Sequence, residues 1–137
     1  MKLLLDIHIL LDIFLQREPH YTASARVFDL CEKGQCQGFL AAQSYATLFY
    51  LLRKGIGKEA TLNTLHLVRR ILDTAPLSAK EVDQALASGF QDFEDALQYQ
   101  VALACGATHL ITRNPVDYPQ AALPVLTPAT FLAVYFP

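Results

Sequence analysis

The sequence predicts a three-layer α/β domain in which helices cover both faces of a central parallel sheet. Short apolar runs of strand length alternate with longer amphipathic segments along the chain, as expected when crossover helices join parallel strands. The chain has 137 residues, of which 53% are hydrophobic and 18% charged. A chain of this length and composition can bury the core of one domain, which we place at residues 1–137.

Five segments carry the signals of buried strands. The first is an apolar run that ends at Asp6, and the fourth has a bias toward β-branched side chains. Pro76 interrupts the third. In chain order the predicted strands are residues 3–6, 38–42, 73–77, 108–112 and 125–126.

Seven segments have apolar residues at helical spacing, with turn or capping signals at their ends. Gly34 follows the second, and Gly55 and Gly57 are predicted to end the third. Ser78 and Glu81 have the capping-box pattern that begins the fifth. In chain order the predicted helices are residues 9–16, 22–33, 43–53, 58–72, 78–88, 92–105 and 129–136.

Acidic and polar side chains follow the predicted strands at the edge of the sheet where ligands bind. In a parallel sheet this edge is formed by the carboxyl ends of the strands. Asp6 ends the first strand there, and Asn114 and Asp117 follow the fourth. Carboxylates that converge repel one another unless a cation lies between them, and oxygen ligands of this kind suit Mg²⁺ or Mn²⁺. The first hypothesis is therefore a metal-dependent hydrolase of phosphate esters.

Each of these segments also has an ordinary structural interpretation. Asp6 lies just before a helix and could cap it, and the sequence favours neither interpretation. Asp92 and Glu94 are typical first-turn acids, which the helix dipole stabilises. Asp95 fits that explanation less well, because it lies on an otherwise apolar helix and shares a face with Asp92. Asn114 and the proline after it form an ordinary turn sequence.

Together these segments resemble the PIN-domain family, in the group that includes VapC-like toxins. The resemblance covers nearly the whole chain and rests on Leu3-Leu4-Leu5-Asp6, on Asp92-Phe93-Glu94-Asp95-Ala96-Leu97-Gln98, and on residues 106–114 with Asp117. It implies a small α/β nuclease, an endoribonuclease that uses Mg²⁺ or Mn²⁺. The implied metal ligands are Asp6, Asp95 and Asp117, and these acids with Asn114 form the implied catalytic set. Further candidates in or beside the site are Asp92, Glu94, Thr112, His8, Ser44 and Thr47.

Two positions depart from the family pattern. The family usually has Asp-x-Asn at the first strand, and here the third residue is His8, whose imidazole could donate a hydrogen bond as the amide would. Many nuclease members also carry a glutamate early in the helix after the second strand, and residues 43–47 contain none. Gln43, Ser44 or Thr47 could hold a metal-bound water there without adding charge. Because fewer carboxylates bind a dication more weakly, the alternative is a catalytically weak or inactive PIN-like module that binds RNA or a protein partner.

Charge and motif spacing limit the other function classes. The formal net charge of −2 argues against binding of nucleic acid by bulk electrostatics. It does not exclude a nuclease, because a local basic patch or a bound dication can offset the acids. Asp12 is expected on the surface of the first helix or behind the site. A phosphotransfer receiver domain would also gather acids at strand ends, but it would need an acidic pair after the first strand and a lysine after a late strand. Asp6 stands alone and Arg113 is not a lysine, so this class is disfavoured.

The expected setting is a cytoplasmic protein. No apolar run has the length of a membrane span, and the first residues lack the layout of a signal peptide. Cys31, Cys36 and Cys105 have no zinc-ligand spacing and are expected to be reduced structural thiols. The resemblance implies an RNA substrate, an antitoxin protein as partner and a homodimer. We expect the dimer to form through apolar faces of the helices at 22–33 and 43–53.

Overall fold

The computed structural model describes residues 1–119 and 121–137, and in this part of the chain five strands form one sheet. Their order is β3-β2-β1-β4-β5, and every neighbouring pair is parallel. The strands are β1 (Lys2–Leu5), β2 (Gln37–Ala41), β3 (Asp73–Ala75), β4 (His109–Ile111) and β5 (Val125–Leu126). The predicted fold class is therefore confirmed, and β1 is the central strand.

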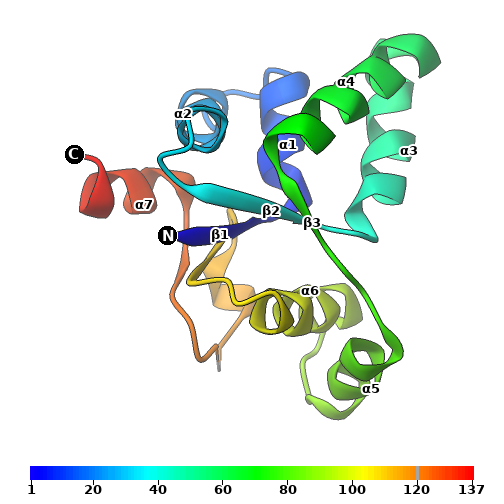
Figure 1. Cartoon of the computed structure of the whole chain (residues 1–137), viewed down its shortest axis with the longest axis vertical. Helices are drawn as coiled ribbons and strands as arrows, with labels where there is room; N and C mark the ends of the chain where they lie inside the picture. Colours follow the sequence, from blue (N-terminus) through cyan, green and yellow to red (C-terminus); the bar gives the residue numbers. More distant parts are fainter. Residues whose placement is uncertain (120) are drawn as a thin grey trace.

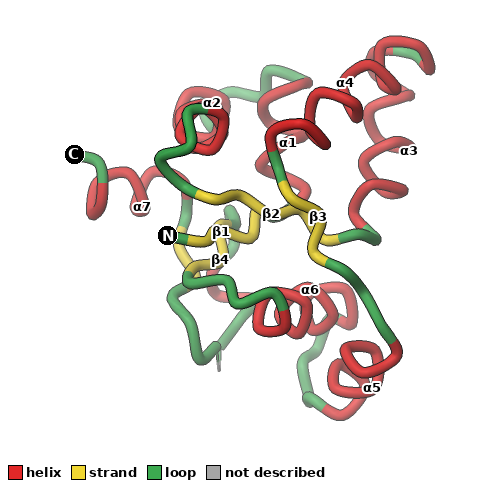
Figure 2. Tube along the Cα trace, viewed as in Figure 1, coloured by secondary structure: helices red, strands yellow, loops and turns green. Residues whose placement is uncertain are grey.

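Helices cover both faces of this sheet, which gives three layers (Figure 1). They are α1 (Ile7–Phe14), α2 (Tyr21–Glu32), α3 (Ser44–Ile56), α4 (Lys58–Ile71), α5 (Ala79–Ala87), α6 (Phe93–Ala104) and α7 (Pro128–Tyr135). Figure 2 shows α1 to α4 on one side of the strands and α5 and α6 on the other. A turn of 3-10 helix at Pro115–Asp117 follows β4.

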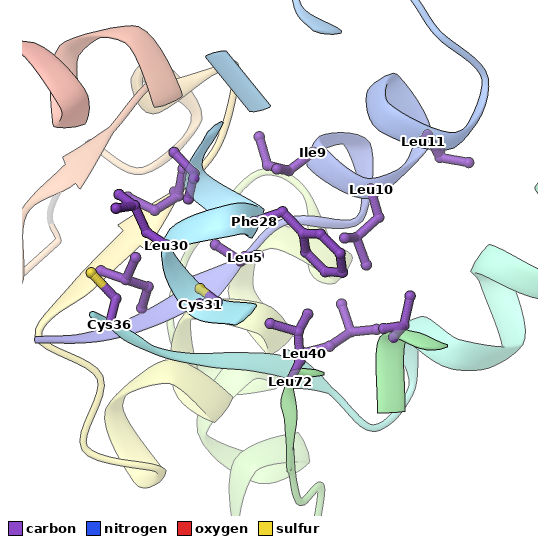
Figure 3. Packing of buried hydrophobic residues seen from close by; sticks show 14 of the residues in the cluster. Leu5, Ile9, Leu10, Leu11, Phe28, Leu30, Cys31, Cys36, Leu40 and Leu72 are labelled. Carbon is purple, nitrogen blue, oxygen red and sulfur yellow. The ribbon is translucent and has the colours of Figure 1, made fainter. Parts of the chain in front are cut away.

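The leucines of β1 divide the core between the two faces of the sheet. Leu3 and Leu5 belong to the cluster under α1 and α2, and Leu4 belongs to the cluster under α6. Figure 3 shows part of the first cluster, where Phe28 of α2 lies with side chains of α1 and β2. All three leucines are fully buried, and each such burial contributes about 1.5–3 kcal/mol. This packing fixes the carboxyl end of β1, and with it Asp6, at the middle of the sheet.

The order in which strands are added to the sheet changes direction at β1. The strands β2 and β3 lie on one side of β1, and β4 and β5 lie on the other. Two connections diverge at such a point and leave a crevice at the carboxyl ends of the strands. The residues that follow β1, β2 and β4 therefore come together at the same edge. The capping box predicted for α5 is also present, with the backbone N–H of Ser78 donating to Glu81 at 2.9 Å.

Several element boundaries differ from the prediction for identifiable reasons. The first helix begins at Ile7, two residues earlier than predicted, so that His8 lies in its first turn. The third continues through Gly55 to Ile56 and ends at Gly57, whose φ of 85° suits glycine. Gly55 packs closely against the first helix: a Cβ there would lie 2.8 Å from Cδ2 of Leu15, so the Leu15 side chain would have to shift. The third strand stops at Ala75, directly before a proline that cannot donate a ladder hydrogen bond.

Burial decides two expectations about side chains on the helices. Of the two places expected for Asp12, the structure has the one behind the site: its side chain is fully buried and pairs with Arg113 Nε at 3.1 Å, directly before Asn114. The side chain of Arg113 is 26% exposed. None of the large apolar side chains of α2 is exposed, whereas Tyr50 and Leu51 of α3 are. Of the two helices predicted for dimer contacts, only α3 offers an exposed apolar face.

No helix within the described residues is long and apolar enough to cross a membrane.

Candidate active site

A hollow of about 420 Å³ lies at the carboxyl ends of β1 and β4, between the starts of α1, α3 and α6. Every candidate site residue predicted from the sequence lines it, with the exception of Asp92. These lining residues are Asp6, His8, Ser44, Thr47, Glu94, Asp95, Thr112, Asn114 and Asp117. We call this hollow the acidic pocket.

Asp6 does not act as a helix cap. It occupies the N-cap position of α1, but its side chain makes no capping hydrogen bond. Its carboxylate is buried and accepts hydrogen bonds from Gln98 Nε2 at 3.2 Å and, over a longer contact of 3.4 Å, from Thr112 Oγ1. The cap interpretation therefore does not account for Asp6, whose carboxylate is bound to residues of α6 and of the segment after β4.

Asp95 lies half-buried on the first turn of α6, where its charge is disfavoured. Burial, then the negative charge of Asp92, and to a smaller extent those of Asp117 and Asp6, raise the pKa of its carboxyl from 3.8 to about 6. A hydrogen bond donated by Tyr118 Oη at 3.2 Å acts in the opposite direction and favours the ionised form. A carboxyl group whose pKa is raised by burial and by three neighbouring negative charges is in a setting typical of a functional site.

The two acids beside Asp95 have different places. Asp92 caps α6, because its carboxylate accepts a hydrogen bond from the backbone N–H of Asp95 at 2.9 Å. The ordinary interpretation of Asp92 is thus correct, and its side chain borders a second hollow of about 410 Å³ that adjoins the acidic pocket. Glu94 follows Asp92 by two positions, in the first turn of α6. It is exposed and lines the acidic pocket together with Ser44 and Thr47.

The segment after β4 brings the third group of candidates to the pocket. Thr112 is buried and accepts a hydrogen bond from the backbone N–H of Asn114 at 3.3 Å, which fixes the turn. The backbone N–H of Asp117 donates to the Asn114 carbonyl at 3.1 Å. Asn114 and Asp117 are exposed at the rim, and Asp117 lies between the acidic pocket and the second hollow.

The side of the pocket formed by α1 and α3 has no carboxylate besides Asp6. His8 Nδ1 and Gln43 Oε1 are buried there without a hydrogen-bond partner among the described residues. Buried polar atoms are nearly always hydrogen-bonded to protein or water, so water or another polar occupant of the pocket would satisfy these two. Ser44 and Thr47 lie beside them and could bind the same occupant.

Two functional neighbours were not predicted from the sequence. Gln98 and Tyr118 are both buried, and they contact the carboxylates of Asp6 and Asp95. Gln98 gave one signal, since it is a polar residue one helical turn after Asp95 on a buried face. Tyr118 gave none, because its role depends on how the loop after β4 folds.

The donor set fits a small divalent cation. Its oxygen ligands suit Mg²⁺ or Mn²⁺, and mutual repulsion around Asp95 would be relieved by positive charge. Among residues 1–119 and 121–137, however, no group of three or more His, Cys, Asp or Glu side chains is arranged around one ion position. Mg²⁺ usually keeps several waters and takes only one or two protein carboxylates, so a smaller ligand set is sufficient.

Comparison with solved structures shows the same fold in toxin–antitoxin proteins. VapBC-1 from nontypeable Haemophilus influenzae is 17% identical, with a TM-score of 0.71, over 94% of this chain and 99% of that chain. VapC20 from Mycobacterium tuberculosis, a toxin that cleaves the sarcin-ricin loop, is 10% identical, with a TM-score of 0.70, over 88% and 96%. VapBC2 from Rickettsia felis, bound to a DNA fragment from its promoter, is 19% identical, with a TM-score of 0.68, over 92% and 97%.

Sequence comparison identifies the family. No curated protein matches this chain. The sequence model described as "PIN domain" matches residues 2–115, which include the first two acidic segments and the start of the third. Members of that family are typically nucleases. Since the match extends over most of the chain and the fold agrees with it, the chain belongs to the PIN-domain family.

Proposed function

We propose that this protein is a ribonuclease that hydrolyses phosphodiester bonds with Mg²⁺ or Mn²⁺ held by Asp6, Asp95 and Asp117. The observation that carries the proposal is the state of Asp6: a buried aspartate at an N-cap position that leaves the helix uncapped and turns its carboxylate to the acidic pocket. An uncapped helix and a buried charge are both unfavourable without a further role.

The residues of the pocket have different roles in such a reaction. A bound dication supplies an acidified water and neutralises charge that develops on the phosphate. Asp6, Asp95 and Asp117 would bind the cation in their ionised forms, and Thr112 would keep Asp6 in place. Asn114, exposed at the rim, orients a water or a phosphate oxygen with its amide. Because the pocket itself is acidic, an RNA phosphate approaches it favourably only when the cation is bound.

Glu94 supports activity despite the missing glutamate in α3. It lines the acidic pocket together with Thr47 and Ser44, so α6 supplies a further acid to the pocket. We propose that Glu94 supplies part of the charge that residues 43–47 lack. Its exposure makes its contribution smaller than that of Asp6 or Asp95.

A second candidate is a PIN-like module that binds RNA or a protein without cleaving. This candidate is favoured by one observation: the described residues contain no group of three acidic, histidine or cysteine side chains around one ion position. The two candidates differ in whether RNA is cleaved in the presence of Mn²⁺.

We also propose that the protein is the toxin of a toxin–antitoxin pair and forms a homodimer. The solved structures with its fold include toxin–antitoxin complexes, among them one from Klebsiella pneumoniae that is 21% identical. Tyr50 and Leu51 on α3 and Leu62 on α4 are exposed apolar side chains suited to association. Light scattering at high protein concentration tests the dimer, and a monomer would contradict it.

The test of the nuclease is cleavage of a mixed RNA pool by the full chain in Mn²⁺, with EDTA as control. We expect cleavage by the natural sequence and none by the Asp95→Asn variant, because the substitution removes one charge from a site with few acids. Asp83→Asn is the matched control, since Asp83 is an exposed aspartate on α5 outside the pocket. Activity that survives Asp95→Asn would remove the site assignment, and an inactive natural protein that still binds RNA would favour the binding module.

A further inference from the structure

Two buried neutral side chains connect the carboxylates of Asp6 and Asp95. Gln98 Nε2 donates to Asp6 Oδ1 at 3.2 Å and to Tyr118 Oη at 2.8 Å. Tyr118 Oη in turn donates to Asp95 Oδ1 at 3.2 Å. Gln98 is 6% exposed and Tyr118 is 5% exposed, so both side chains are largely shielded from water. We call the pair Gln98–Tyr118 the amide–phenol bridge.

The direction of each hydrogen bond in the bridge follows from which of the groups can donate a proton and which can only accept one. The amide of Gln98 must present its nitrogen to Asp6, because its oxygen would face a carboxylate that cannot donate. The phenol oxygen then accepts the second amide proton and directs its own proton to Asp95. Each of the two carboxylates thus receives one neutral donor at Oδ1. The Oδ2 atom of each is left for other partners, of which Thr112 makes the long contact with Asp6.

The bridge and the two carboxylates that it connects come from three different parts of the fold. Gln98 is on the buried face of α6, one turn after Asp95. Tyr118 follows the 3-10 turn that contains Asp117, and its ring packs edge-on against Phe90 at 6.2 Å between centroids. Asp6 ends β1. A connection between these parts sets the distance and orientation of two carboxylates that come from separate elements and would otherwise repel each other.

We propose that Gln98 and Tyr118 are positioning residues that hold Asp6 and Asp95 in the orientation in which they bind the divalent cation. This inference rests on the proposed metal-dependent function. The bridge satisfies one oxygen of each carboxylate with a neutral donor and keeps both side chains in one rotamer before the cation arrives. Partners of this kind behind metal ligands typically change metal affinity 10- to 100-fold when they are lost.

The experiment compares two buried tyrosines that differ in what their hydroxyl contacts. Tyr118→Phe removes the donor to Asp95 and keeps the ring. Tyr99→Phe is the matched control, because Tyr99 is 6% exposed, packs on the same Phe90 ring, and its hydroxyl accepts from the backbone N–H of Ala122 at 2.6 Å, away from the acids. The measurement is Mn²⁺ affinity of the full chain by electron paramagnetic resonance, with thermal unfolding of the metal-free proteins beside it.

We expect Tyr118→Phe to weaken Mn²⁺ binding roughly 10- to 100-fold and Tyr99→Phe to leave it unchanged. Gln98→Met, which keeps the length of the side chain and removes its donors, should weaken binding in the same way. If the two residues act as one bridge, the double variant loses less than the sum of the two single losses. Gln98→Met also keeps the test decisive if Tyr118→Phe does not fold.

Two results would overturn the inference while leaving the proposed function intact. The first is tight Mn²⁺ binding by the natural protein that neither Tyr118→Phe nor Gln98→Met weakens. The second is an equal loss in Tyr99→Phe, which would assign the effect to core packing. Absence of Mn²⁺ binding in the natural protein would instead overturn the proposed metal site, and the bridge with it.

Discussion

Asp95 shows how one residue acquires chemistry from its surroundings. Its carboxyl lies half-buried beside Asp92, Asp117 and Asp6, and burial, followed by these charges, raises its pKa from 3.8 to about 6. The folded protein therefore binds this proton more tightly than the unfolded chain does between about pH 4 and 6. The contribution of this group to stability falls as pH rises through that window. A bound cation would reverse the effect, because it favours the ionised form.

At this scale we predict that Asp95 of the metal-free protein titrates near pH 6 and that Mn²⁺ binding strengthens from pH 5 to pH 7. Protons and the cation compete for the same carboxylate, so removal of the proton favours the metal. The measurement is an NMR titration of side-chain carboxyl shifts, with Asp83 as an exposed aspartate for comparison. Titration of Asp95 at its ordinary value of 3.8 would contradict the described burial and crowding.

At the scale of elements, a buried ion pair joins α1 to the segment after β4. Asp12 of α1 is fully buried, and the side chain of Arg113 is 26% exposed. The two groups approach to 3.1 Å without a well-aligned hydrogen bond, so Coulomb attraction holds them together. Arg113 directly precedes Asn114, and the pair therefore fixes the start of the turn that leads to Asp117.

Removal of one partner leaves the other charge partly buried and unpaired. We predict that Asp12→Ala lowers the free energy of unfolding by about 3 kcal/mol. Asp29→Ala is the matched control: Asp29 pairs with Lys33 at 2.7 Å on the surface of α2, and loss of such an exposed pair changes stability by less than about 1 kcal/mol. Urea unfolding measures both variants. Equal effects would mean that Arg113 does not depend on Asp12.

Local sequence patterns predicted the secondary-structure elements. The features that they missed depend on contacts between residues far apart in the sequence. Within the described residues, the alternation of short apolar runs with amphipathic segments predicted every strand and α-helix, since each signal lies within the element itself. The 3-10 turn at Pro115–Asp117 was not predicted. Gly55 was misassigned as a helix end. It lies inside the helix, in close contact with Leu15, which lies 40 positions earlier in the sequence. The bond of Asp12 to Arg113 and the bonds of Tyr118 likewise join residues far apart in sequence, which spacing does not reveal.

The sequence predicted the acids of the candidate pocket better than the side chains that contact them, Gln98 and Tyr118. Strand ends and helix starts of a parallel sheet meet at one edge, so the sequence positions of Asp6, Asp95 and Asp117 were sufficient to place them in one pocket. The ordinary explanation was correct for Asp92, which caps α6, and insufficient for Asp6. The sequence could not distinguish these two aspartates, because each precedes a helix and only the folded chain determines where the side chain turns.

At the scale of the whole molecule, the position of β1 determines the site. Its leucines are buried on both faces, it lies between β2 and β4, and the order in which strands are added to the sheet changes direction there. This arrangement gathers residues that are about 90 to 110 positions apart around Asp6, as its contacts with Gln98 and Thr112 show. The roles assigned to the acids, the bridge and the turn after β4 all assume that this edge binds a dication.

The measurement that tests this claim most directly is a crystal of the natural protein soaked in Mn²⁺ and recorded at a wavelength that gives an anomalous signal from manganese. We predict one strong peak in the acidic pocket, with carboxylate oxygens of Asp6 and Asp95 about 2.0–2.6 Å from the ion. A peak only at other sites, or no peak at a concentration that supports RNA cleavage, would contradict the account.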